Sequence, residues 1–264
     1  MFLKFRNGYG FGTKKQKEDT TKRKMVLFCL SDLHGTCYEP RNRPIIECAW
    51  DQKPDLILAS GDMLSGDREE GDAIAVALLS RLSGLAPVCF VNGNHEMCVE
   101  RHQPERYQKF MDDLKNGGVQ VLHNETAWFW IDGEKVAVTG YELPWEYYRR
   151  FSRRHPSVVG MERSIGKRKQ DAYQILLTHN PVFFEEYTAW GADFTFAGHL
   201  HGGFIRLPYF GGVISPQFQL FPKYDHGLYQ MDTSSMVVGA GMGNHSGLFR
   251  INNPTEVVTV RIKR

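Results

Sequence analysis

Long apolar runs are absent from this 264-residue sequence. No stretch approaches the roughly 20 apolar residues that a membrane-spanning helix needs. The opening residues, MFLKFRNGYGFG, lack the apolar core of a signal peptide. We therefore expect a cytoplasmic protein whose contact with a membrane is peripheral, at the inner face of the cell membrane.

Cysteine is scarce and odd in number. The five cysteines form no Cys-x-x-Cys pair, and Cys29 and Cys89 lie inside apolar runs. That pattern is typical of free, mostly buried thiols in a reducing compartment. It argues against a disulfide scaffold and against a metal site built from thiolates.

The small formal net charge of +2 at pH 7 hides two basic segments. Residues 1–24 carry eight basic and two acidic side chains, a net charge of +6. Residues 149–169 carry eight basic side chains and one acidic one, a net charge of +7. Subtracting both segments from the total leaves −11 for the rest of the chain. The net charge therefore gives little information about binding partners, whereas the two basic segments are the regions where an anionic partner would bind.

Short apolar runs alternate with segments of helical length beyond residue 24, which is typical of a layered α/β fold. We predict a flexible arm over residues 1–24 and a single domain over residues 25–264, built from two packed mixed β-sheets flanked by helices. The predicted helices are residues 44–52, 71–83 and 104–116, and the predicted strands are residues 25–30, 55–59, 87–91, 119–122, 127–131, 135–139, 172–177, 193–197, 227–231, 236–239 and 256–262.

Polar residues recur where five of the predicted strands end. Open α/β sheets bind ligands at the carboxyl ends of their strands, so these positions are the natural place for chemistry. The motifs there are Asp32-x-His34, Gly61-Asp62, Gly93-Asn94-His95-Glu96, Thr178-His179-Asn180 and Gly198-His199-Leu200-His201.

The motifs offer carboxylate oxygens, imidazole nitrogens and an amide oxygen, a donor set that suits divalent Mn, Fe, Zn or Mg. Alternate residues share a face on extended backbone, so Asp32 and His34 are expected side by side, as are His199 and His201. One carboxylate can bridge two ions about 3.5–4 Å apart. Asp62 is the natural bridge because its motif stands alone on the middle strand. We predict two divalent metal ions, of open identity.

Taken in order, the five motifs resemble the motif series of the calcineurin-like metallophosphoesterases over most of residues 25–262. The segment from His201-Gly202-Gly203 to Ser215-Pro216-Gln217 is similar to a bacterial branch of phosphohydrolases, often membrane-associated, that includes lipid-headgroup pyrophosphatases. Leu200 and Phe204 depart from the residues usual in that branch.

The resemblance implies a role for each motif residue. One metal ion would be held by Asp32, His34, Asp62 and His201, and the other by Asp62, Asn94, His179 and His199. His95 would be catalytic, stabilising charge in the transition state or protonating the leaving-group oxygen. The nucleophile would be a metal-bridging hydroxide. Glu96 either orients His95 or a ligand from behind, or caps the helix that follows, and the residues leave both readings open.

One segment is too long for an ordinary loop. Residues 144–170, here called the insertion, interleave aromatic and basic side chains. This composition suits an anionic membrane surface, which we favour, a single-stranded nucleic acid, or a solvated lid paired with the acidic body. The candidate substrate-binding residues are Arg149, Arg150, Arg153 and Arg154.

We predict a metal-dependent phosphoesterase that hydrolyses a phosphomonoester, phosphodiester or pyrophosphate bond, with a phosphorylated lipid headgroup as the preferred substrate. Within enzymes, the alternative is a nuclease or nucleotide phosphodiesterase. Outside enzymes, the alternative is a scaffold that keeps the fold without catalysis. The complete set of seven candidate ligands together with His95 argues against the scaffold.

Overall fold

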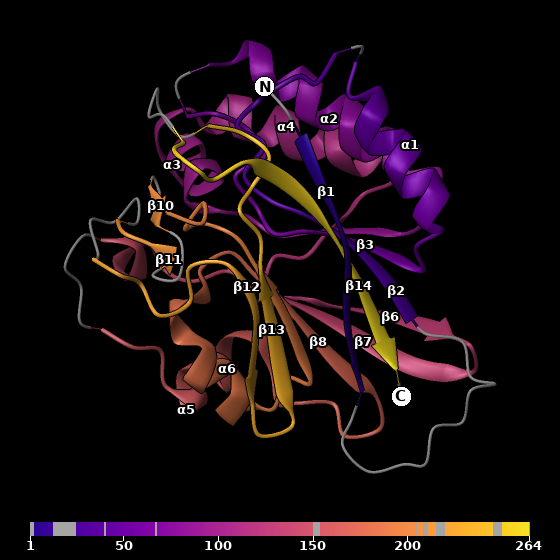
Figure 1. Ribbon diagram of the computed structural model, residues 1–264, viewed down its shortest axis with the longest axis vertical. Helices are drawn as coiled ribbons and strands as arrows, with labels where there is room; N and C mark the ends of the chain where they lie inside the picture. Colours follow the sequence, from indigo (N-terminus) through magenta and orange to yellow (C-terminus); the bar gives the residue numbers. More distant parts are fainter. Residues whose placement is uncertain are drawn as a thin grey trace.

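Two six-stranded β-sheets pack face to face and carry helices on their outer faces (Figure 1). This computed structural model describes residues 3–12, 25–39, 41–66, 68–149, 154–203, 205–207, 211–214, 220–244 and 250–263. The prediction of two packed mixed sheets flanked by helices is confirmed. Within the described residues, no helix is both long enough and apolar enough to cross a bilayer.

The first sheet has a parallel centre with an antiparallel neighbour. Its strands, in spatial order, are β1 (Leu3–Gly12), β14 (Thr255–Lys263), β2 (Met25–Leu30), β3 (Leu56–Ala59), β4 (Val88–Phe90) and β5 (Gln120–Val121). β2 to β5 run parallel, and β14 runs antiparallel to β2. Its outer face carries α1 (Arg43–Gln52), α2 (Glu70–Ser83) and α4 (Pro104–Asn116) (Figure 1).

The second sheet is also mixed. Its strands, in spatial order, are β12 (Gly227–Met231), β13 (Ser234–Val238), β9 (Phe194–Ala197), β8 (Tyr173–Thr178), β7 (Glu134–Tyr141) and β6 (Thr126–Ile131). β13, β9, β8 and β7 run parallel, with β12 and β6 antiparallel at the edges. The helices α5 (Val158–Ile165) and α6 (Phe184–Trp190) lie on its outer side (Figure 1).

Alternating side chains explain why the sheets stack. In β2, Leu27 and Cys29 enter the core between the sheets, whereas Phe28 and Leu30 enter the core under α1, α2 and α4. Successive residues of a strand point to opposite faces, so a strand with two apolar faces needs cover on both. The first sheet is therefore buried between a layer of helices and the second sheet.

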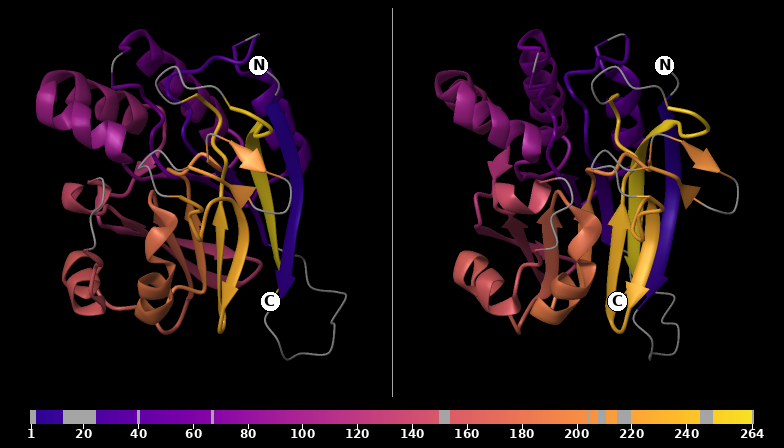
Figure 2. Two further views of the ribbon diagram at one scale, coloured as in Figure 1. Left: turned by 60° about the vertical axis from the view of Figure 1, so that its left-hand side comes forward. Right: turned by 90° about the vertical axis from the view of Figure 1, so that its left-hand side faces the viewer.

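The amino-terminal segment differs from the flexible arm predicted for it. Residues 3–12 form β1, which runs parallel to β14 along its length with a register shift between Asn7 and Tyr9 (Figure 2). Its three glycines and one asparagine have low strand propensity, so the composition of this segment did not indicate a strand. Pairing with the edge of an existing sheet stabilises it instead. The remainder of the predicted arm, residues 13–24, lies outside the described residues.

Short elements around the strand ends were not predicted. They are the helix α3 (Asn94–His102), the two-stranded pair β10 (Arg206–Leu207) and β11 (Gly211–Gly212), and the 3-10 turns η1 (Trp145–Tyr148) and η2 (Pro181–Phe183). The outer helices α5 and α6 were not predicted either. α3 and η1 matter for function, because each places a side chain directly at the site described next.

Candidate active site

Loops from both sheets bring the motif residues to one edge of the molecule. Asp32 and His34 follow β2, Asp62 follows β3, His179 follows β8, and His199 and His201 follow β9. Asn94 and His95 begin α3, directly after β4. All these strands are parallel within their sheets, so their carboxyl ends meet, as predicted.

The backbone at the site is not extended, which corrects the sequence argument for Asp32 and His34 and for His199 and His201, the latter two of which lie in different clusters. Both residues adopt left-handed conformations, with φ of 53° and 48°, as do Asp62, His199 and His201. Non-glycine residues rarely adopt such φ values, and strained residues of this kind concentrate at functional sites. Hydrogen bonds from the N–H groups of Asp32 and His34 to the carbonyls of Gly61 and Asp62, each 3.0 Å, hold these loops together.

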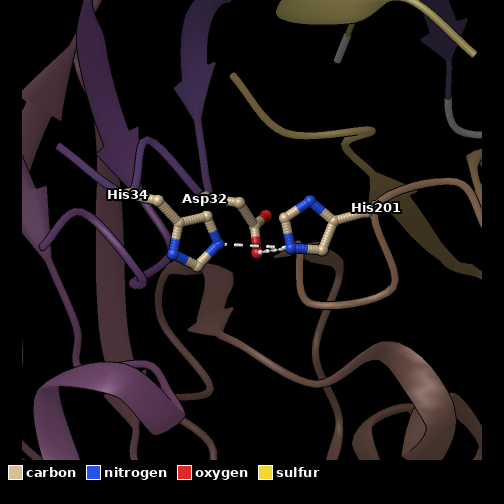
Figure 3. Close-up of side chains that lie close together, drawn as sticks. All are labelled: Asp32, His34 and His201. Carbon is tan, nitrogen blue, oxygen red and sulfur yellow. Dashed lines mark hydrogen bonds and ion pairs between the residues drawn. The ribbon is translucent and has the colours of Figure 1, made fainter. Parts of the chain in front are cut away.

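One cluster joins Asp32, His34 and His201 (Figure 3). Nε2 of His34 lies 3.2 Å from Nε2 of His201, which in turn lies 3.4 Å from Oδ1 of Asp32. Nε2 of His34 is also 4.0 Å from Oδ2 of Asp62. Three buried donor atoms therefore converge, and the carboxylate of Asp62 lies near one of them, so Asp62 is the candidate for a fourth ligand.

A second cluster joins Asp62, His179 and His199. Nδ1 of His179 lies 2.6 Å from the carbonyl oxygen of Ser60, so in the neutral ring Nδ1 donates and Nε2 keeps its lone pair. That lone pair faces Oδ2 of Asp62 at 3.2 Å. Two acceptors at this distance need a cation between them, either a proton or a metal ion.

Burial and charge show how strongly the site favours cations. Burial and the nearby carboxylate of Asp62 outweigh the opposing effect of His179 and raise the pKa of Asp32 to about 6. Burial lowers the pKa of His179, but Asp62 and Asp32 outweigh burial and raise it to about 9. The buried Oδ1 of Asn94 has no hydrogen-bond partner among the described residues. Buried carboxylate and amide oxygens and imidazole nitrogens, grouped in this way, suit two divalent metal ions.

His95 forms a third group of this kind with His34 and Asp62, and its side chain is 16% exposed. Its backbone N–H donates to Oδ1 of Asp62 at 2.8 Å, and its Nε2 lies 4.0 Å from Oδ2 of the same carboxylate. The N–H of Gly66 donates to Nδ1 of His95 at 3.2 Å. The neutral ring therefore carries its proton on Nε2, the nitrogen that faces the clusters.

Glu96 combines the two roles that the sequence left open. The carboxylate is fully buried and accepts from the N–H groups of Gly93 and Asp62 on Oε2, both 2.8 Å, and from those of Met63 and Leu64 on Oε1, at 2.8 and 3.1 Å. Burial and nearby Asp62 raise its pKa to about 7, while the backbone N–H groups favour the charged form. Glu96 thus caps α3 and ties the Asp62 loop to it.

Two glycines leave room for the carboxylates. A Cβ at Gly93 would collide with Oδ1 of Asp62, and a Cβ at Gly198 would collide with Oδ2 of Asp32. The glycines of these motifs are therefore required by close packing against the candidate ligands.

The insertion reaches the site through Tyr148. The ring centroid of this buried residue lies 5.2 Å from that of His199 and 6.0 Å from that of His179. Arg149 is exposed, and Arg154 is exposed and paired with Glu146 at 3.2 Å. The other two predicted substrate-binding residues, Arg150 and Arg153, lie outside the described residues.

Sequence reasoning missed residues from distant parts of the chain that form hydrogen bonds with the candidate ligands or pack against them. Nη2 of Arg250 lies 2.9 Å from Nδ1 of His201, and Nδ2 of Asn253 donates to the carbonyl oxygens of His201 and Gly203. Tyr148 was named only as one aromatic residue of the insertion. No spacing or motif marks these residues, because their contacts depend on how distant loops pack.

Comparison with known proteins identifies the family. The profile of the family described as Calcineurin-like phosphoesterase matches residues 25–203. Phosphodiesterase YaeI of Escherichia coli (strain K12) is 26% identical over 239 residues, covering 90% of this chain and 81% of the relative. The uncharacterized metallophosphoesterase YkuE of Bacillus subtilis (strain 168) is 25% identical over 224 residues, covering 83% of this chain and 72% of the relative.

Solved structures share the fold. NAD nucleotidase (NadN) of Haemophilus influenzae aligns with a TM-score of 0.54 and 16% identity, covering 83% of this chain and 50% of the other. This chain therefore spans about half the length of that structure. The family match includes all five motifs, and the clustered histidines and aspartates supply the donors that a metal pair needs. The chain thus belongs to the calcineurin-like phosphoesterases, as a metal-dependent phosphohydrolase whose cofactor is a pair of divalent metal ions.

Proposed function

We propose that this enzyme hydrolyses a phosphodiester bond in a substrate with a phosphorylated, lipid-like headgroup. The observation that carries the proposal is the convergence of His95 with seven candidate ligands at one edge of the two sheets. A relative named as a phosphodiesterase supports the choice of a diester. One ion would be held by Asp32, His34, Asp62 and His201, and the other by Asp62, Asn94, His179 and His199.

The chemistry divides between the ions and His95. Two divalent ions bound here would polarise the phosphoryl oxygens and generate a hydroxide nucleophile near neutral pH. His95 donates from Nε2 to a phosphoryl oxygen or to the leaving-group oxygen, where negative charge grows during the reaction. Asp62 orients His95 by accepting its backbone N–H at 2.8 Å.

The insertion supports the lipid-like part of the proposal. Tyr148 packs against His179 and His199, so the insertion contacts the second cluster. Trp145 is 43% exposed and Arg149 is exposed. An exposed indole with adjacent guanidinium groups suits an anionic headgroup at a membrane surface. We assign substrate binding to Arg149, Arg150, Arg153 and Arg154, and peripheral membrane contact to the same segment.

Reconstitution of metal-free protein with Mn²⁺ tests the diesterase activity. We expect about two bound ions per chain and faster hydrolysis of bis-p-nitrophenyl phosphate than of p-nitrophenyl phosphate. A folded, Mn²⁺-loaded protein that is inert on both esters would refute the activity. Faster cleavage of the monoester would refute the choice of a diester.

Sedimentation with phosphatidylglycerol vesicles at low salt tests the lipid-like part. We expect binding that weakens as salt is added, because surface charges are screened, and that weakens further in Arg149→Ser. Arg43→Ser is the matched control, since Arg43 is an exposed arginine on α1 paired with Glu47. Binding to single-stranded DNA without binding to vesicles would show that the lipid-like substrate is wrong.

A further inference from the structure

An arginine on α4 with a largely buried side chain holds the loop that faces His95. The side chain of Arg106 is 8% exposed, and its guanidinium forms a two-pronged ion pair with Asp72 on α2, both contacts at 2.7 Å. Nη2 of Arg106 also donates to the carbonyl oxygen of Ser65 at 2.8 Å, with a longer contact to that of Arg68 at 3.3 Å. Arg106 thus anchors the loop after β3 to two helices.

The carbonyl of Ser65 and the N–H of Gly66 belong to one peptide group. This group is planar, and in its usual trans form the carbonyl and the N–H point in opposite directions. Arg106 holds the carbonyl end, while the N–H end donates to Nδ1 of His95 at 3.2 Å. A cation on the carbonyl polarises the peptide group, which strengthens donation from its N–H.

This peptide group decides which nitrogen of His95 carries the proton. A neutral imidazole has one N–H, and a backbone N–H can only donate. With Gly66 donating to Nδ1, the proton of the neutral ring is on Nε2. Nε2 is the atom that lies 4.0 Å from Oδ2 of Asp62 and faces the reacting phosphate in the proposed mechanism.

We propose that Arg106 is a positioning residue for phosphoester hydrolysis, holding His95 in its Nε2–H tautomer through the Ser65–Gly66 peptide group. This inference rests on the catalytic role proposed for His95. Lysine cannot replace Arg106, because one ammonium group lacks the planar fork that spans the Asp72 carboxylate and the Ser65 carbonyl.

Nitrogen-15 NMR of the histidine rings in Zn²⁺-loaded protein measures the tautomer directly. We expect the Nε2–H form of His95 in the wild type and a mixture of both forms in Arg106→Lys. Lys109→Gln is the matched control, because it removes an exposed ion pair from the same helix. An Nδ1–H tautomer in the wild type, or an unchanged tautomer in Arg106→Lys, would overturn the inference.

A second pair of variants leaves Arg106 in place, in case its replacement prevents folding. Gly66→Pro removes the N–H that donates to His95, whereas Gly66→Ala keeps it and places a Cβ 3.4 Å from Nδ1, an ordinary contact. We expect the Nε2–H tautomer to persist in Gly66→Ala and to be lost in Gly66→Pro. The same tautomer in both variants would contradict the role of this peptide group.

Kinetics separate a role through His95 from general loosening of the fold. We expect Arg106→Lys to lower kcat/KM for bis-p-nitrophenyl phosphate about tenfold, and to change it less than about twofold in a His95→Ala background. Equal losses in both backgrounds would overturn this inference and leave the proposed function standing. Wild-type turnover in His95→Ala would overturn the role of His95 and the inference together.

Discussion

At the scale of single residues, pairs of nitrogen and oxygen atoms lie close together in the buried site. Oδ2 of Asp62 faces Nε2 of His179 at 3.2 Å, and Nε2 of His34 faces Nε2 of His201 at the same distance. Each pair therefore needs a proton or a metal ion between its two atoms, because two lone pairs facing each other in a buried site repel. The function of each residue is therefore best tested by counting ions and turnover separately.

Removing the carboxylate that we propose as the bridge, Asp62, and removing the neighbouring imidazole, His95, should have different results. We expect Asp62→Asn to lose bound metal and activity together, because Asp62 belongs to both proposed ligand sets. His95→Ala should keep its metal and lose about 10²- to 10⁴-fold in kcat, since only a proton donor is removed. Elemental analysis beside the diester assay measures both quantities, and metal loss in His95→Ala would show that His95 is a ligand.

Glu96 should matter for stability because four N–H groups converge on its carboxylate. In Glu96→Gln, an amide NH₂ would face N–H donors, leaving buried donors unsatisfied at a cost of about 1–3 kcal/mol. Urea unfolding of the metal-free protein measures the loss. Glu100→Gln, an exposed change on the same helix, is the control. A loss no larger than that of the control would contradict the tie between α3 and the Asp62 loop.

At the scale of secondary-structure elements, a turn outside the two sheets contributes to the site. The turn η1 carries Tyr148 onto the rings of His179 and His199, so the insertion forms one wall of the second cluster. A ring that packs against a metal-binding side chain restricts the orientation of that side chain, and this orientation affects the affinity for the metal ion.

Because Tyr148 lies against the second cluster, we expect it to affect the affinity for one of the two ions. We expect Tyr148→Ala to weaken binding of one ion about 10- to 100-fold and to leave the other unchanged, because the candidate ligands whose rings it packs against are His179 and His199. Tyr148→Phe keeps the ring and should bind both ions normally. Isothermal titration with Mn²⁺ resolves the two steps. Equal weakening of both ions in Tyr148→Ala would contradict this assignment.

Elements with a clear periodicity were predictable, and those made by tertiary contact were not. The strand over residues 25–30 and the helix over residues 104–116 match β2 and α4, because apolar runs and a proline at a helix start are local signals. β1 was missed because it depends on pairing with β14, which is distant in sequence. The motif residues were predictable, since strand ends converge in any such sheet. The left-handed backbone that aims them, and the support from Arg106 and Tyr148, arise only when loops pack.

At the scale of the whole molecule, the proposed ligands come from both sheets. Asp32, His34 and Asp62 follow strands of the first sheet, and His179, His199 and His201 follow strands of the second. Each proposed ion therefore bridges the two sheets at their carboxyl edge and adds to the apolar core that joins them.

Chelation should therefore destabilise the fold as well as abolish activity. An ion that binds only the native state stabilises it by about 4 kcal/mol at a thousandfold excess over its Kd. We expect EDTA to lower Tm and Mn²⁺ to restore it, with a smaller shift in Asp62→Asn. Calorimetry in both conditions measures the effect, and superimposable unfolding curves would show that the ions do not join the sheets.

The split of ligands between the sheets also has a consequence during synthesis. The amino-terminal half of the chain supplies three of the four proposed ligands of one ion and two of the four for the other. His201, the last of them, follows β9, after five strands of the first sheet and four of the second among the described elements. A nascent chain therefore has no complete metal site until most of both sheets has been made, so loading with metal reports that the two halves have met.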